Sequence, residues 1–176
     1  MPEFYHFNIE RKFMDNQKFE ELAKLYPDLL QKAQISDFGV DNGWYNILGV
    51  LCEKISYRVD RARMYMRYEI EKNNTDLSKF ELEVEQAIEE LPTIVQVKEK
   101  FGTLRFYVDN ASDEIRNYIS FAESLSGHTC EICGSPGTIR NTGWIKVLCD
   151  KHHTEREEES KNNQEWYDDI DDYFGS

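Results

Sequence analysis

Two pairs of potential metal ligands stand in the last third of the 176-residue chain, and the members of each pair are three residues apart. Cys130 and Cys133 make a Cys-x-x-Cys pair, and Cys149 and His152 make a Cys-x-x-His pair. A tight turn, or the first turn of a helix, brings two such side chains to one Zn²⁺ ion, with zinc–sulfur bonds of about 2.3 Å. The spacing therefore predicts a Cys₃His zinc site.

The fourth ligand has three candidates. His152 is favoured because Cys-x-x-His repeats the spacing of the first pair, while His153 and His128 remain alternatives. Three thiolates and one imidazole fill a tetrahedron and leave no position for water, so we expect a structural zinc rather than a catalytic one. Glu131, inside the first pair, is expected to face solvent.

The segment between the two ligand pairs is expected to fold as a short hairpin. Gly134 and Gly137 allow the positive φ that a turn after the first pair requires. Residues 138–148 predict two strands that reverse at 141–143, and a charged helix is expected over 154–161. Turn, hairpin and helix in this order are typical of a treble-clef zinc finger.

The residues that precede the finger predict a mainly helical domain. Apolar residues spaced three and four apart indicate helices over 14–34, with a break at Pro27, and over 78–91 and 112–125. Asp41 or Asn42 is expected to cap a longer helix. The apolar stripe of that helix consists of Trp44, Leu48, Leu51, Ile55, Val59, Ala62 and Met66.

Alternating apolar residues over 94–100 and 103–108 predict a β-hairpin within this domain. The side chains expected to face the core are Val95, Val97, Leu104, Phe106 and Val108. The fold class that follows is α+β. Its parts are a helical domain with a hairpin (1–126, hairpin 94–108), a small treble-clef-like zinc finger (127–160) and an acidic aromatic tail (161–176).

The charge of the chain is strongly negative and uneven. The formal net charge is −13, and residues 155–176 hold nine acidic side chains against two basic ones. Such a surface repels nucleic-acid phosphates and attracts basic protein surfaces. The start of the chain has no apolar secretory signal, and no run of about 18 apolar residues suits a bilayer. Cysteines clustered as metal ligands indicate a reducing compartment, so the cytoplasm is the expected location.

The sequence favours a protein without enzymatic activity. It contains no glycine-rich phosphate loop, no Gly-x-Ser-x-Gly and no Gly-x-Gly-x-x-Gly. A nuclease that places a His–Asn–His set on a finger would need a histidine on the hairpin, but residues 138–148 contain none. No catalytic residue is therefore expected.

Three stretches of the chain are similar to one known family. They are Asp41-Asn-Gly-Trp-Tyr with Leu51-Cys-Glu-Lys-Ile, then Val95-Gln-Val-Lys-Glu-Lys-Phe-Gly-Thr-Leu-Arg-Phe-Tyr-Val, then Cys130-Glu-Ile-Cys-Gly with Gly143-Trp and Leu148-Cys-Asp. They resemble a family of uncharacterised small zinc-binding proteins of phages, prophages and some bacteria. The resemblance implies a compact helical domain with a hairpin and a zinc finger, and an origin in a mobile element. It implies no activity, and it places the protein in the bacterial host cytoplasm.

Two functions compete on these grounds. The first is binding to a protein with a basic surface, such as a bacterial defence or regulatory protein that a phage inhibits. The segment expected to make this contact, unless it is a disordered solubilising tail, consists of Trp166, Tyr167, Asp168, Asp169, Ile170, Asp171, Asp172, Tyr173 and Phe174. The second is nucleic-acid binding by the finger, with help from the basic helix around 58–67. The residues expected for it are Arg140, Trp144, Lys146 and Lys151.

Overall fold

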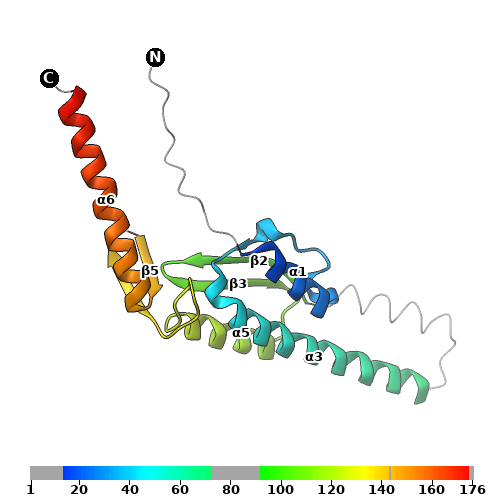
Figure 1. Ribbon diagram of the computed structural model, residues 1–176. Coiled ribbons are helices and arrows are strands. Elements are labelled where there is room, and N and C mark those ends of the chain that lie inside the picture. Colours follow the sequence, from blue (N-terminus) through cyan, green and yellow to red (C-terminus); the bar gives the residue numbers. More distant parts are fainter. Residues whose placement is uncertain (1–13, 73–91, 143, 175–176) are drawn as a thin grey trace.

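The computed structural model describes residues 14–72, 92–142 and 144–174. Its elements form a helical body with a small sheet, followed by a finger and a long final helix (Figure 1). In chain order the elements are α1 (Asn16–Leu25), α2 (Pro27–Leu30), η1 (Ile35–Asp37), β1 (Phe38–Gly39), η2 (Asn42–Trp44), α3 (Tyr45–Lys72), β2 (Thr93–Lys100), β3 (Thr103–Asp109), α5 (Asp113–Ser126), β4 (Thr138–Thr142), β5 (Trp144–Leu148) and α6 (Asp150–Phe174). The fold class is α+β, as the sequence predicts.

The first half of α3 forms the centre of the core. Trp44, Leu48 and Ile55 have no exposed surface, and they pack with side chains from α1, α2 and the sheet. Of the predicted stripe, Val59 is buried but Ala62 is exposed, and the side chain of Met66 lies outside the described residues. Beyond that point α3 extends past the sheet, while α5 lies beside its first half (Figure 1).

The helix breaks have local causes. Pro27 begins α2, so the predicted interruption of the first helical segment is confirmed. The side chain of Ser112 accepts a hydrogen bond from the backbone N–H of Ile115 and caps α5. Asp41 precedes η2 but makes no side-chain cap there. The helix predicted over 78–91 lies outside the described residues.

The three-stranded sheet has the order β1-β2-β3, with β1 parallel and β3 antiparallel to β2. The helices cover one face of this sheet, where Val97, Leu104 and Phe106 are buried. The expected position of Val95 is wrong: this side chain is 46% exposed, and Ile94 is buried in its place. The reason is an irregularity in the β2–β3 register between Ile94 and Gln96, which shifts the alternation by one residue.

The edge of the sheet formed by β3 is covered by α5. The backbone N–H of Leu104 donates to the hydroxyl oxygen of Ser126, and that of Phe106 donates to the carboxylate of Glu123. Two ladder donors of β3 therefore find partners on a helix rather than on another strand. This arrangement fixes α5, and with it the start of the finger.

The finger consists of a turn, the antiparallel hairpin β4–β5 and α6. Strand β5 contacts the first part of α6, and the rest of this helix projects away from the sheet (Figure 1). The backbone of 166–174 continues α6 without a break, whereas the side chains of 163–174 lie outside the described residues. Among the helices described, none is long and apolar enough to cross a bilayer.

Candidate metal centre

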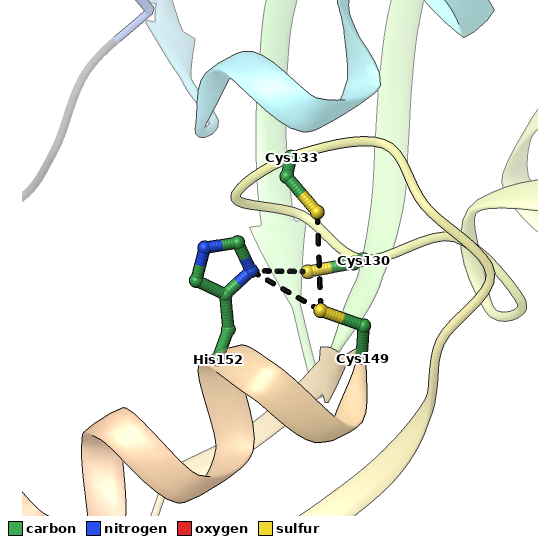
Figure 2. Close-up of side chains that lie close together, drawn as sticks. All are labelled: Cys130, Cys133, Cys149 and His152. Carbon is green, nitrogen blue, oxygen red and sulfur yellow. Dashed lines mark hydrogen bonds between the residues drawn. The ribbon is translucent and has the colours of Figure 1, made fainter.

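Four side chains from the two ligand pairs converge on one point of the finger (Figure 2). The sulfurs of Cys130, Cys133 and Cys149 and one ring nitrogen of His152 all lie within 4.8 Å of one another. Nδ1 of His152 is 3.4 Å from Sγ of Cys130 and 3.3 Å from Sγ of Cys149. The sulfurs of Cys133 and Cys149 are 3.9 Å apart. These are the separations that ligands of a single tetrahedral ion require.

The turn that carries the first pair is held by its own backbone. The N–H of Gly134 donates to the carbonyl oxygen of Cys130, and the N–H of Cys130 donates to that of Ser135. Gly134 has a φ of +79°, which a residue with a side chain rarely adopts. The turn thereby directs both sulfurs toward α6.

The second pair is positioned by the start of α6. Cys149 directly precedes this helix and His152 lies in its first turn, with the N–H of His153 donating to the carbonyl oxygen of Cys149. Nε2 of His152 lies 3.7 Å from a carboxylate oxygen of Glu155. A carboxylate at the second ring nitrogen is the usual partner that orients a metal-ligating histidine.

The geometry also separates the three histidine candidates. Nε2 of His153 points to Glu157, at 3.5 Å, and the side chain is not part of the cluster. His128 is exposed and lies before the turn. Of the three, the structure therefore brings His152 to the cysteines.

The thiols of the first pair differ in their electrostatic surroundings. Burial raises the pKa of Cys130. Burial also acts to raise the pKa of Cys133, but hydrogen bonds with Ser135, Cys130 and Cys149 outweigh it and lower that pKa to about 6. At least one sulfur is thus readily ionised, as a metal-binding thiolate must be.

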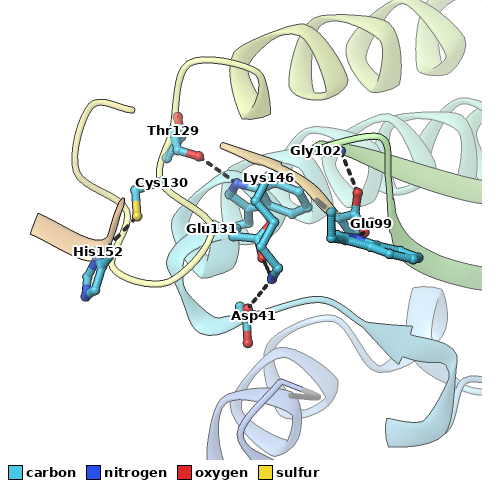
Figure 3. A network of polar contacts seen from close by, with 10 residues as sticks. Asp41, Glu99, Gly102, Thr129, Cys130, Glu131, Lys146 and His152 are labelled. Atoms are coloured by element: carbon cyan, nitrogen blue, oxygen red, sulfur yellow. Dashed lines mark hydrogen bonds and ion pairs between the residues drawn. The ribbon is translucent and has the colours of Figure 1, made fainter. Parts of the chain in front are cut away.

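The expected exposure of Glu131 is wrong, since this residue is only 2% exposed. Its carboxylate accepts a hydrogen bond from the ammonium group of Lys146 on β5, which also lies 3.5 Å from a carboxylate oxygen of Asp41 (Figure 3). Burial raises the pKa of Glu131 to about 7, while Lys146 acts to lower it. Sequence reasoning missed this pairing because the partners come from three separate segments.

The finger is docked on η2, directly before α3. The N–H of Gly43 donates to the carbonyl oxygen of Glu131 at 2.8 Å, and the indole N–H of Trp44 donates to that of Thr129 at 3.0 Å. A Cβ atom on Gly43 would lie 2.2 Å from the carbonyl oxygen of Cys130. Only glycine permits this approach of two backbones. The residues around the first ligand pair therefore pack directly against the edge of the main core.

The cations expected to serve nucleic-acid binding on the finger are engaged by carboxylates. Arg140 pairs with Asp150, and Lys151 lies 3.7 Å from Glu155. Lys146 is the partner of Glu131 described above. Trp144 is 65% exposed, and its indole N–H donates to Glu99 on β2. The finger hairpin thus offers phosphates little unpaired positive charge.

Comparisons of the chain with family models, with curated proteins and with solved structures gave no significant match. The resemblance to phage zinc-binding proteins stays a prediction. The chemistry of the clustered side chains is the basis on which a function can be proposed.

Proposed function

We propose that the protein binds one structural Zn²⁺ ion at Cys130, Cys133, Cys149 and His152. The convergence of three sulfurs and one imidazole nitrogen within 4.8 Å is the observation that carries this proposal. Thiolate ligands in a tetrahedral arrangement favour zinc over the harder magnesium and calcium ions, and a set of four leaves no open position for a substrate.

The metal would fix the direction of α6. Cys149 and His152 flank the start of this helix, and Cys130 and Cys133 belong to the turn that is docked on η2. An ion bound by both pairs therefore joins α6 to the body of the protein. The helix has 25 residues and, at 1.5 Å per residue, a length of about 37 Å.

We infer that the protein acts by binding another protein rather than by catalysis, and that α6 makes the contact. Residues 155–176 carry nine acidic side chains against two basic ones, and carboxylates alternate with large apolar residues over 165–174. An acidic helix with apolar residues suits a basic groove with an apolar floor. A bacterial defence or regulatory protein is the partner class that the resemblance to phage proteins suggests, and the bacterial cytoplasm is the corresponding location.

A capture experiment with matched variants tests this function. The full chain and a chain truncated after Lys161 would be immobilised with zinc bound and exposed to a bacterial extract. A third sample would carry Trp166→Ala and Ile170→Ala, which keep the acidic charge of the helix. We expect one partner to be retained by the full chain and lost from both altered chains, at unchanged thermal stability.

Retention of the same partner by the truncated chain would show that the part of α6 beyond Lys161 is not the contact. Capture that survives the two alanine substitutions but disappears at high salt would show that charge alone attracts the extract protein, without a specific groove. Either result would contradict the proposed mode of binding.

A further inference from the structure

The tip of the β2–β3 hairpin holds a large apolar residue in an unfavourable position. Phe101 has a φ of +53° and Gly102 one of +78°, so the two-residue loop resembles a type I′ turn. Asparagine and glycine are the residues that this turn favours, and a bulky side chain with positive φ is rare. The Phe101 side chain is nevertheless 67% exposed, so burial gives no compensating stability. Such an outlier is a reason to look for a function.

The open face of the sheet extends from this tip and is basic. Lys98 lies directly opposite Arg105 on the neighbouring strand, and Lys100 lies opposite Thr103. Like charges in directly opposed positions destabilise a sheet. Within 14–72, 92–142 and 144–174, the guanidinium of Arg105 donates to Thr103 and to the carbonyl oxygen of Leu104 rather than to a carboxylate. Positive charge is thus concentrated on one face at a cost to the fold.

Aromatic rings stand at both ends of this basic row. Nζ of Lys98 lies 5.1 Å from the ring centroid of Tyr107, and Nζ of Lys100 lies 5.5 Å from that of Phe101. Tyr107 is 43% exposed. On β1, Gly39 is paired with Lys98 and adds no side chain to the face.

We propose that this face, defined by Lys98, Lys100, Phe101, Arg105 and Tyr107, binds single-stranded nucleic acid. Rings that stack on bases, alternating with cations that contact phosphates, are the general means by which proteins hold single strands. The stretch of β2 from Gln96 to Lys100 is about 13 Å long at 3.3 Å per residue. This length matches roughly four nucleotides at 3.4 Å each. The surface therefore suits a short segment with a base stacked at each end.

The overall acidity of the chain does not oppose this contact locally. Most of the excess negative charge lies in 155–176, and α6 leads away from the sheet (Figure 1). Charges beyond a Debye length of about 8 Å are largely screened at physiological salt. This surface is separate from the cations of the finger, and its proposed role is independent of the partner of α6.

The test is fluorescence anisotropy of a labelled oligothymidylate and of the matching oligouridylate with the zinc-loaded full chain. We expect both single strands to bind at low salt and a matched duplex to bind more weakly. With three cations in contact, the logarithm of the binding constant should fall with that of salt concentration with a slope of about −2. The two oligonucleotides distinguish a DNA from an RNA preference.

Two pairs of variants separate the surface from general effects. Phe101→Asn should weaken binding about tenfold, as loss of one base stack does, and should raise the melting temperature because asparagine suits the turn. Phe121→Ala is the control, since Phe121 is 70% exposed on α5. Lys98→Glu should weaken binding, while Lys24→Glu on α1 makes the same change in net charge and should not.

Failure of both oligonucleotides to bind at low salt would overturn the proposal, as would equal effects of the test and control variants. Equal binding of duplex and single strands would overturn the stacking contact. One further outcome would replace nucleic acid by a second copy of the chain as the ligand of this face. In that outcome the chain binds neither oligonucleotide but associates with itself, and both Lys98→Glu and truncation after Lys161 abolish the self-association.

Discussion

The indole nitrogen of Trp44 lies 3.0 Å from the carbonyl oxygen of Thr129 and donates a hydrogen bond to it, across 85 positions of the sequence. Trp44 is fully buried at the end of η2, directly before α3, and Thr129 directly precedes Cys130, the first candidate metal ligand. The candidate metal centre and the main core therefore share a boundary. Disturbing one side of it should be measurable on the other.

The contact of Gly43 with the metal-binding turn gives the first prediction. Gly43→Ala should destabilise the protein by about 3 kcal/mol or more, because the new methyl group would meet the carbonyl oxygens of Cys130 and Glu131. It should also weaken zinc retention against a chelator. Gly49→Ala is the control: its Cβ meets nothing within 4 Å, and alanine should stabilise α3 by about 0.5–1 kcal/mol. Calorimetry and a zinc-chelator titration measure both effects, and equal behaviour of the two variants would contradict the docking.

The buried pair of Glu131 and Lys146 gives the second prediction. Lys146→Met should cost about 3–5 kcal/mol of unfolding free energy, because it leaves a buried carboxylate without its partner. Adding Glu131→Gln should recover part of that loss by removing the charge. Denaturant unfolding of the wild type and the single and double variants would measure the coupling. Strict additivity of the two substitutions would show that the side chains do not interact.

The four cysteines should fall into two classes of reactivity. Cys52 has no exposed surface, and burial raises its pKa to about 12, so it should not react with a thiol reagent in the folded protein. With zinc bound, the three clustered thiols should react slowly, and a chelator should release them together. A thiol count of three after chelation and four after denaturation is expected. Fast reaction of all three clustered thiols in the untreated protein would speak against bound metal.

The edge of β3 gives a further prediction. Ser126→Ala should cost about 1–3 kcal/mol, because the buried N–H of Leu104 would lose its acceptor. Ser124→Ala, at an exposed position of the same helix, should change stability little. Hydrogen exchange at the Leu104 amide provides the local measurement. Unchanged protection there in Ser126→Ala would mean that α5 does not close the sheet.

Much of the fold follows from local sequence patterns. The spacing of apolar residues predicts α3 and α5, and Pro27 predicts the break between α1 and α2. The alternation of apolar and polar residues predicts the hairpin over 94–108. The ligand pairs are likewise local, three residues apart on a turn and at a helix start. These features depend on residues close in sequence, where propensity and periodicity are informative.

The features that the sequence did not reveal are long-range. Val95 turns outward because the register of β2 on β3 shifts, which one strand alone does not encode. Burial of Glu131 depends on Lys146 and Asp41, which come from other segments. The full length of α6 is a further case: the sequence predicts a charged helix over 154–161 and leaves the acidic segment beyond it open between a partner-binding segment and a disordered tail, whereas the helix runs from Asp150 to Phe174.

X-ray absorption spectroscopy at the zinc edge of the purified protein tests the central claim most directly. A closed site of Cys130, Cys133, Cys149 and His152 predicts three sulfur neighbours at about 2.3 Å and one nitrogen at about 2.0–2.1 Å, with no oxygen neighbour. Absence of bound zinc, or a coordination sphere with fewer sulfurs and a water oxygen, would contradict a closed structural zinc site.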